Sequence, residues 1–160
     1  MSPKTFLVAL AAITAIGFGV RLGHLLVEER HEPASGDAAF YHRTANLLAD
    51  GKGYIDPFRY GDGFVGAYER ALPDGTTETV TVTFPPGIEQ PTAAHPPAWA
   101  YLLSFASRLG FDSESDHRAV GVLVGTLGVA LIGLAGRELF GDRAGLVSAI
   151  AWRCAAAKPP

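Results

Sequence analysis

The sequence predicts an all-α membrane protein, in which polytopic transmembrane helices are interrupted by a long external loop carrying a juxtamembrane helix and a β-hairpin. Its 160 residues are 48% hydrophobic with a mean hydropathy of +0.19, which is high for a soluble domain. The apolar residues cluster in four segments instead of alternating along the chain. Between the first two segments, Glu28–Ala94 holds 11 acidic residues against five Lys and Arg, which is typical of a solvated loop.

The first apolar segment runs from Phe6 to Val20 and continues past Arg21 to Val27. Its length reaches the roughly 20 residues that a bilayer-spanning helix needs. A secretory signal peptide is the rival interpretation, but no A-x-A cleavage site follows the apolar run, and the later apolar segments favour an anchor. Because an arginine facing lipid is costly, we expect Arg21 to face a protein partner, a cavity or the interface.

Charge predicts the orientation of this segment. Lys4 precedes it and three glutamates follow it, at Glu28, Glu29 and Glu32. The bias of positive charge toward the cytoplasm therefore places the N-terminus inside the cell and loop 28–94 outside the membrane.

Two further segments have helical character. Pro96–Phe111 opens with prolines that suit the first turn of a helix, and it is short for a span. Ala119–Gly136 is the clearest membrane helix in the chain. Its Gly121 and Gly125 form a GxxxG pair, which lets another helix approach closely, so we expect this face to pack against protein.

The last apolar segment, Ala144–Ala157, is short and is interrupted by Arg153. We expect it to be the beginning of a helix and the chain to be the N-terminal part of a larger polytopic protein. The resulting division is a first transmembrane helix at 1–27, an extracytoplasmic loop at 28–94 and further transmembrane helices at 95–160.

Two elements are predicted within the loop. Residues 37–50 have the pattern of an amphipathic helix that Gly51 ends, with Tyr41, Ala45 and Leu48 on one face. Next to a membrane exit, such a helix is expected to lie at the interface with its aromatic side chains toward lipid. Further on, the alternation from Thr79 to Phe84 follows a Pro-Asp-Gly turn at 73–75 and predicts a β-hairpin.

Asp37 is the candidate catalytic residue. Aspartate is among the best N-terminal caps, so a structural role accounts for it as well. The functional interpretation is a carboxylate held at the water–lipid boundary, within range of a lipid-borne substrate. The two roles are compatible because a helix N-terminus stabilises the ionised carboxylate.

Four side chains are candidates for substrate binding: Tyr41, His42, Arg43 and His95. Arg43, like Lys52, attracts phosphate, although two solvated loop charges account for both residues. His42 and His95 are candidate hydrogen-bonding groups or bases, and a histidine alone is more often structural.

Several classes of site have no support in the sequence. The single cysteine, Cys154, excludes an internal disulfide and a cysteine-based metal cluster. No metal ligands are assigned, no cofactor is identified, and no P-loop, Rossmann fingerprint or catalytic triad is present. Nucleic acid is not an expected partner because the chain has no basic patch.

The order and spacing of four motifs resemble a known family. They are "RLGHLL" at the end of the first helix, "GDAAFYHRTANLLADGKGY", "HPPAWAYLLSFASRLG" and the run from "HRAVGVLVG" to "GLVSAIA". Together they resemble the N-terminal third of bacterial membrane glycosyltransferases of the protein mannosyltransferase and aminoarabinose-transferase type, with the C-type architecture. The resemblance covers nearly the whole chain apart from the hairpin and the last residues.

The resemblance implies transfer of a sugar from a polyprenyl-phosphate donor to a protein, glycan or lipid acceptor, outside the cytoplasm and at the cell membrane. It places Asp37 at the family's acidic position in the first external loop. Many members carry a second acid there, where this chain has Ala38. The alternative hypothesis is a non-catalytic membrane subunit whose external hairpin binds a partner.

Overall fold

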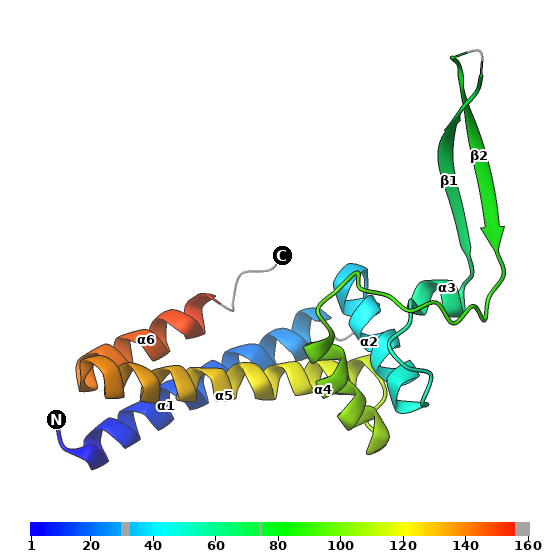
Figure 1. The fold of residues 1–160 in the computed structure, drawn as a ribbon. Helices are drawn as coiled ribbons and strands as arrows, with labels where there is room; N and C mark the ends of the chain where they lie inside the picture. The colour runs from blue at the N-terminus through cyan, green and yellow to red at the C-terminus, as the bar shows by residue number, and fades with distance from the viewer. Residues whose placement is uncertain (30–32, 74, 156–160) are drawn as a thin grey trace. The chain divides into compact units, whose positions relative to one another are not determined.

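The computed structural model describes residues 1–29, 33–73 and 75–155 and is mostly helical (Figure 1). Contacts divide the chain into two compact units, Met1–Pro33 with Ser115–Pro160 and Ala34–Glu114. The elements in chain order are α1 (Pro3–His24), the π-helical turn η1 (Leu25–Glu29), α2 (Gly36–Ala49), α3 (Pro57–Gly61), β1 (Phe64–Ala71), β2 (Thr77–Phe84), α4 (Pro97–Arg108), α5 (Glu114–Phe140) and α6 (Asp142–Ala155).

Two helical segments of the first unit are long and apolar enough to cross a bilayer. Pro3–Val27 has 25 residues and Glu114–Phe140 has 27 residues, and they contain the first and third apolar segments of the sequence. Large apolar side chains remain exposed along both, for example Val8 at 71% and Leu127 at 57%. Such a surface suits lipid better than water.

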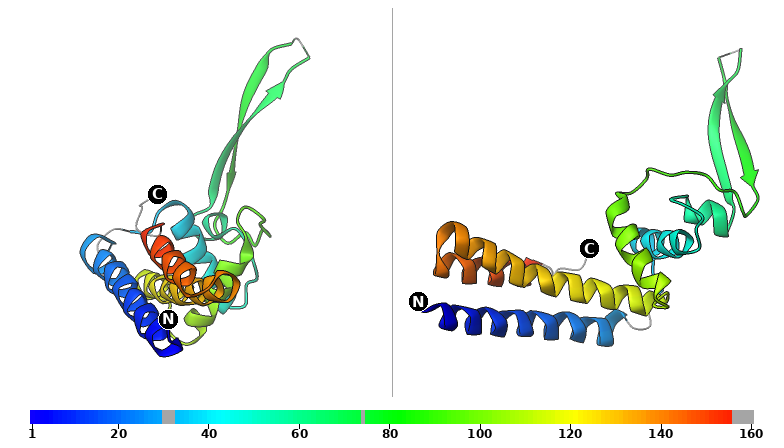
Figure 2. Two further views of the ribbon diagram at one scale, coloured as in Figure 1. Left: turned by 90° about the vertical axis from the view of Figure 1, so that its left-hand side faces the viewer. Right: turned by 60° about the horizontal axis from the view of Figure 1, so that its bottom comes forward.

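A small apolar core joins α1, α5 and α6. It consists of four buried side chains, Phe6, Leu10, Val129 and Ala149. Helices α5 and α6 are joined at Gly141, whose φ of 88° permits the sharp reversal, and α6 runs back along α5 (Figures 1 and 2).

Glycines allow α5 and α6 to approach closely. A Cβ atom added to Gly145 would lie 2.5 Å from the carbonyl oxygen of Gly133 and 2.8 Å from the backbone nitrogen of Arg137. Beside this contact, Arg137 Nε donates to Asp142 Oδ1 at 2.8 Å. Small residues therefore set the distance between these helices, as they do in membrane bundles.

Arg21 lies against α5 at the predicted glycine face. A Cβ atom added to Gly125 would lie 3.0 Å from Arg21 Nε, and Arg21 Nη1 donates to the carbonyl oxygen of Gly17 at 3.1 Å. Its Nη2 atom is buried and has no hydrogen-bond acceptor among the described residues. Of the three surroundings expected for Arg21, which were a protein partner, a cavity or the interface, the structure shows a neighbouring helix of the same chain, and Gly125 faces another helix as predicted.

In the second unit, α2 packs against α4. The predicted helix at 37–50 is confirmed, and Gly51 follows its end with a φ of 79°. The predicted orientation toward lipid is wrong, because Phe40, Ala45 and Leu48 are buried within the protein. From the other side, α4 contributes its own buried residues, which include Ala100 and Leu103.

The predicted β-hairpin is also confirmed. Strands β1 and β2 pair antiparallel, with Phe64 opposite Phe84 and Ala71 opposite Thr77. Asp74 of the predicted turn lies outside the described residues. At the base of the hairpin, an isolated bridge pairs Ile55 with Pro91.

Candidate functional site

Asp37 lies in the first turn of α2 and is not its N-terminal cap. The cap is Ser35, whose backbone is extended with φ −130° and ψ 163°, and Gly36 begins the helix. The predicted capping role of Asp37 is therefore wrong, because the helix starts one residue before it. The Asp37 side chain is 80% exposed. An accessible carboxylate is suited to accept a proton.

His95 lies beside Asp37 although it is distant from it in the sequence. The separation between His95 Nε2 and Asp37 Oδ1 is 3.9 Å, which is too long for a hydrogen bond but within ion-pair range when the histidine is protonated. The His95 ring centroid lies 4.2 Å from that of Phe40 and 5.5 Å from that of Tyr41. The fold thus brings together Asp37, Tyr41 and His95 out of the five predicted site residues.

Tyr54 holds the backbone at His95 and was not singled out from the sequence. Its hydroxyl donates to the carbonyl oxygen of His95 at 2.9 Å. Its ring meets Phe40 edge-on at 6.4 Å and stacks on Tyr101 at 6.2 Å with an interplanar angle of 13°. Burial, followed by the neighbouring hydroxyls of Tyr41 and Tyr101, raises the pKa of Tyr54. We call Phe40, Tyr41, Tyr54, His95 and Tyr101 the aromatic cluster.

No local sequence signal marks Tyr54 as a member of this cluster. The hydrogen bond to His95 spans 41 positions, and Tyr101 comes from α4. Before Tyr54 the sequence has Gly51, Lys52 and Gly53, and Gly53 has a φ of 84°. The two glycines predict a turn, but they do not predict that Tyr54 binds the backbone of His95.

Arg43 forms an ion pair with Asp62. Its Nη1 atom lies 2.5 Å from Asp62 Oδ2, and its guanidinium lies over the Phe58 ring at 5.2 Å from the centroid. Asp37 and Arg43 are six positions apart, which places them about a third of a turn from each other around α2. The structure therefore separates Arg43 from the Asp37–His95 pair by helix position. The side chain of His42, also on α2, is half-buried.

Lys52 is likewise paired. Its Nζ atom donates to Glu89 Oε1 at 3.1 Å, and this hydrogen bond, with the charge of Glu89, raises the pKa of Lys52. Both cations that could attract phosphate are thus exposed and paired with carboxylates, which agrees with their interpretation as surface charges.

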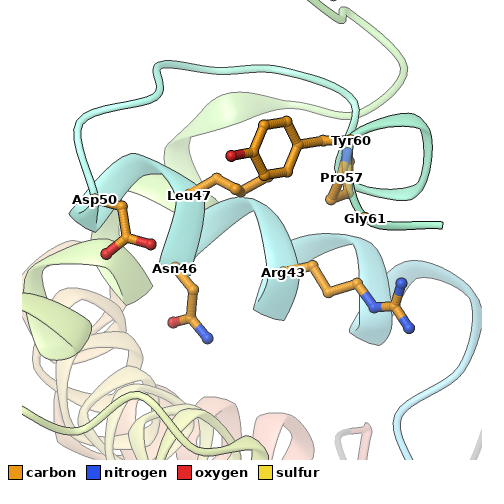
Figure 3. Close-up of a pocket in the computed structure, with 7 residues that line it drawn as sticks. All are labelled: Arg43, Asn46, Leu47, Asp50, Pro57, Tyr60 and Gly61. Carbon is orange, nitrogen blue, oxygen red and sulfur yellow. The ribbon is translucent and has the colours of Figure 1, made fainter. Parts of the chain in front are cut away.

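Arg43 also lines a shallow hollow in the second unit. The hollow has a volume of about 210 Å³ and is bordered by residues of α2 and α3 (Figure 3): Arg43, Asn46, Leu47, Asp50, Pro57, Tyr60 and Gly61. The hollow contains neither Asp37 nor His95, so it does not surround the candidate base. In the described part of the chain, no three His, Cys, Asp or Glu side chains form a group that could hold a metal ion.

Comparison with known proteins relates part of the chain to a family of membrane enzymes. The family model for dolichyl-phosphate-mannose-protein mannosyltransferase matches residues 94–157, a segment that begins just before His95 and includes α4, α5 and α6. No curated protein and no solved structure matches the chain. Asp37 lies outside the matched segment, whereas His95 lies inside it. Over residues 94–157 the chain is therefore similar to the dolichyl-phosphate-mannose-protein mannosyltransferases, a relationship that supports the membrane glycosyltransferase superfamily indicated by the order of its motifs.

Proposed function

We propose that this chain belongs to a membrane glycosyltransferase and presents Asp37 to a sugar carried on a polyprenyl phosphate, on the extracytoplasmic side of the cell membrane. The observation that carries the proposal is the exposed first-turn carboxylate of Asp37 beside His95. The family match over residues 94–157 and the two helices long enough to span a bilayer support the same conclusion.

In the proposed reaction, Asp37 acts as the general base. The Asp37 carboxylate takes the proton of the acceptor hydroxyl as its oxygen bonds to the anomeric carbon of the sugar. The bond from that carbon to the phosphate oxygen breaks, and the polyprenyl phosphate leaves with the bonding electrons. At 80% exposure the carboxylate is accessible to a substrate arriving from outside the protein. Tyr41, His42, Arg43 and His95 are proposed to contact the donor or the acceptor, which is a protein, glycan or lipid.

The proposal includes a polytopic topology with residues 1–27 as the first span and the following loop outside the cell. The sequence places the end of this loop at residue 94 and assigns residues 95–160 to further spans. The compact unit Ala34–Glu114 supports a later boundary, because it groups α4 with the loop. We therefore propose that the external part extends through α4 and that α5 is the next span.

The decisive experiment replaces Asp37 by Asn in the complete protein that carries this sequence. We expect Asp37→Asn to reduce sugar transfer by about 10²- to 10⁴-fold, which is the usual cost of losing a general base. The matched control is Asp50→Asn, which removes an exposed carboxylate from the other end of the same helix and should leave transfer unchanged.

Transfer is measured in membranes with a panel of labelled polyprenyl-phosphate sugars, and membrane extraction verifies insertion of each variant. A well-inserted Asp37→Asn protein that transfers sugar as fast as Asp50→Asn would refute the assignment of Asp37. If the unmodified protein transferred no sugar from any donor in the panel, the glycosyltransferase proposal itself would lose its support.

A further inference from the structure

The outward face of α4 is apolar. Four large side chains remain exposed on α4 and just past its end, and we call them the outer α4 stripe: Tyr101 at 54%, Leu102 at 42%, Phe105 at 68% and Leu109 at 62%. Their spacing places them along one side of a helix. Phe111 follows, at 55% exposure. Large apolar side chains that lie exposed next to one another on a helix mark an interaction surface.

The opposite, protein-facing side of α4 carries the polar groups. Ser107 Oγ donates to Asn46 Oδ1 at 2.8 Å, and Arg108 Nη2 donates to the carbonyl oxygen of Leu48 at 3.2 Å. Ser104 is buried and donates to the carbonyl oxygen of Tyr101 at 2.8 Å. This distribution is the reverse of that in a helix of a water-soluble protein, where polar groups face outward. Because α2 covers the inner side of α4, whatever contacts the outer α4 stripe must come from outside this compact unit.

The covalent chain ties this stripe to a membrane boundary. Leu109 precedes Glu114, the first residue of a 27-residue candidate span, by five positions. Even a fully extended connection of that length covers no more than about 18 Å. At the other end of the unit, the Ala34 amide donates to Glu114 Oε2 at 2.8 Å, and Ala34 follows the Pro3–Val27 candidate span along the chain. Both ends of the unit therefore lie next to residues that lead into spans.

We propose that the outer α4 stripe docks into the bilayer surface, with its side chains in the boundary between lipid headgroups and acyl chains. Lipid is the occupant that the charge pattern favours, because the stripe carries no ionic group, while Tyr101 supplies an amphipathic ring of the kind enriched at this boundary. The amphipathic helix that rests on lipid is thus α4, and α2 is held above it by packing. This inference rests on the two spans and is independent of the glycosyltransferase proposal.

Spin labels in nanodiscs test the proposal on the full chain. Cys154→Ser removes the single native cysteine, and single cysteines for labelling are then introduced by Phe105→Cys, Leu127→Cys or Thr79→Cys. All three positions are exposed, so the labels do not disturb a core. The accessibility of each label to oxygen, which concentrates in lipid, is compared with its accessibility to a water-soluble nickel chelate.

We expect the Phe105 label to favour oxygen, as the Leu127 label in the candidate span should, and the Thr79 label in β2 to favour nickel. A Phe105 label as accessible to nickel as the Thr79 label would overturn the proposal. So would a Phe105 label shielded from both reagents, and dipolar broadening that disappears on dilution with unlabelled protein would identify a second copy as the occupant. If the Leu127 label also favoured nickel, the membrane placement of α5 would fail and the proposal with it.

Discussion

Tyr54 connects the surroundings of Asp37 to a part of the chain that is distant in the sequence. Its hydroxyl holds the carbonyl of His95 at 2.9 Å, and its ring lies between Phe40 of α2 and Tyr101 of α4. His95 in turn lies 3.9 Å from the Asp37 carboxylate. A change at Tyr54 is therefore expected to act on the candidate site without removing any group that meets substrate.

The raised pKa of Tyr54 predicts how stability depends on pH. The folded state holds the phenolic proton more tightly than the unfolded chain, so this contribution is fully present below the unfolded pKa of about 10 and is lost as pH rises through the raised folded pKa. Tyr54→Phe should lower the free energy of unfolding by about 1 kcal/mol near neutral pH, the typical value of one hydrogen bond. Melting temperatures of both proteins against pH provide the measurement.

The difference in melting temperature between the unmodified and the Tyr54→Phe protein should become smaller above about pH 10. Only the unmodified protein then loses the contribution of Tyr54 to the free energy of unfolding. Tyr101→Phe provides a control, since Tyr101 makes the same stacking contact from an exposed position. A constant difference between unmodified and Tyr54→Phe protein across the alkaline range would contradict the assigned titration.

At the scale of elements, glycine decides which helices touch. Gly145 on α6 faces backbone atoms of α5, whereas a Cβ atom added to Gly19 on α1 would meet no neighbouring atom within 4 Å. The two glycines share the same helical preference and differ in their surroundings. Their contrast separates the effect of helix propensity from that of helix packing.

Gly145→Ala should destabilise the first unit, because the added methyl would lie 2.5 Å from the Gly133 carbonyl oxygen and the helices would have to separate. Overpacking of this kind costs about 1 to 3 kcal/mol. Gly19→Ala should be neutral or slightly stabilising, since alanine is the better helix former by about 0.5 to 1 kcal/mol. The thermal stability of each variant is measured as the loss of monodisperse protein on heating in detergent. Equal melting of the two variants would show that α5 and α6 do not pack as described.

At the scale of the whole molecule, the position of the loop relative to the membrane is the property on which the proposed function depends. A lipid-linked donor used outside the cytoplasm requires Asp37 to lie outside. The hairpin gives this topology an accessible probe, because Thr79 of β2 is exposed and belongs to the same loop.

In a Cys154→Ser background, Thr79→Cys should react with a membrane-impermeant thiol reagent in intact cells. Lys4→Cys, on the predicted cytoplasmic side, should react only after lysis. The reverse pattern would invert the topology, and labelling of both positions before lysis would argue against a span between them.

Local patterns in the sequence were sufficient to predict the elements whose formation depends on residues close together in the chain. Continuous apolar composition marked the cores of Pro3–Val27 and Glu114–Phe140, alternation marked the hairpin, and Gly51 marked the end of α2. Each of these signals depends on residues within a few positions of one another. The same signals placed the N-terminal cap of α2 wrongly, because Ser35 and Asp37 are both good caps and only the backbone chooses between them.

Packing between distant segments was decided only in three dimensions. Two short amphipathic helices each offer an apolar face, and the sequence of α2 does not reveal that α4 covers it, nor that α4 then keeps its larger apolar side chains outside. The same limit applies to Tyr54 and His95, which are 41 positions apart, and to Arg21 against Gly125. Such contacts depend on which surfaces remain uncovered once the elements have formed, and residues within one element carry no record of that outcome.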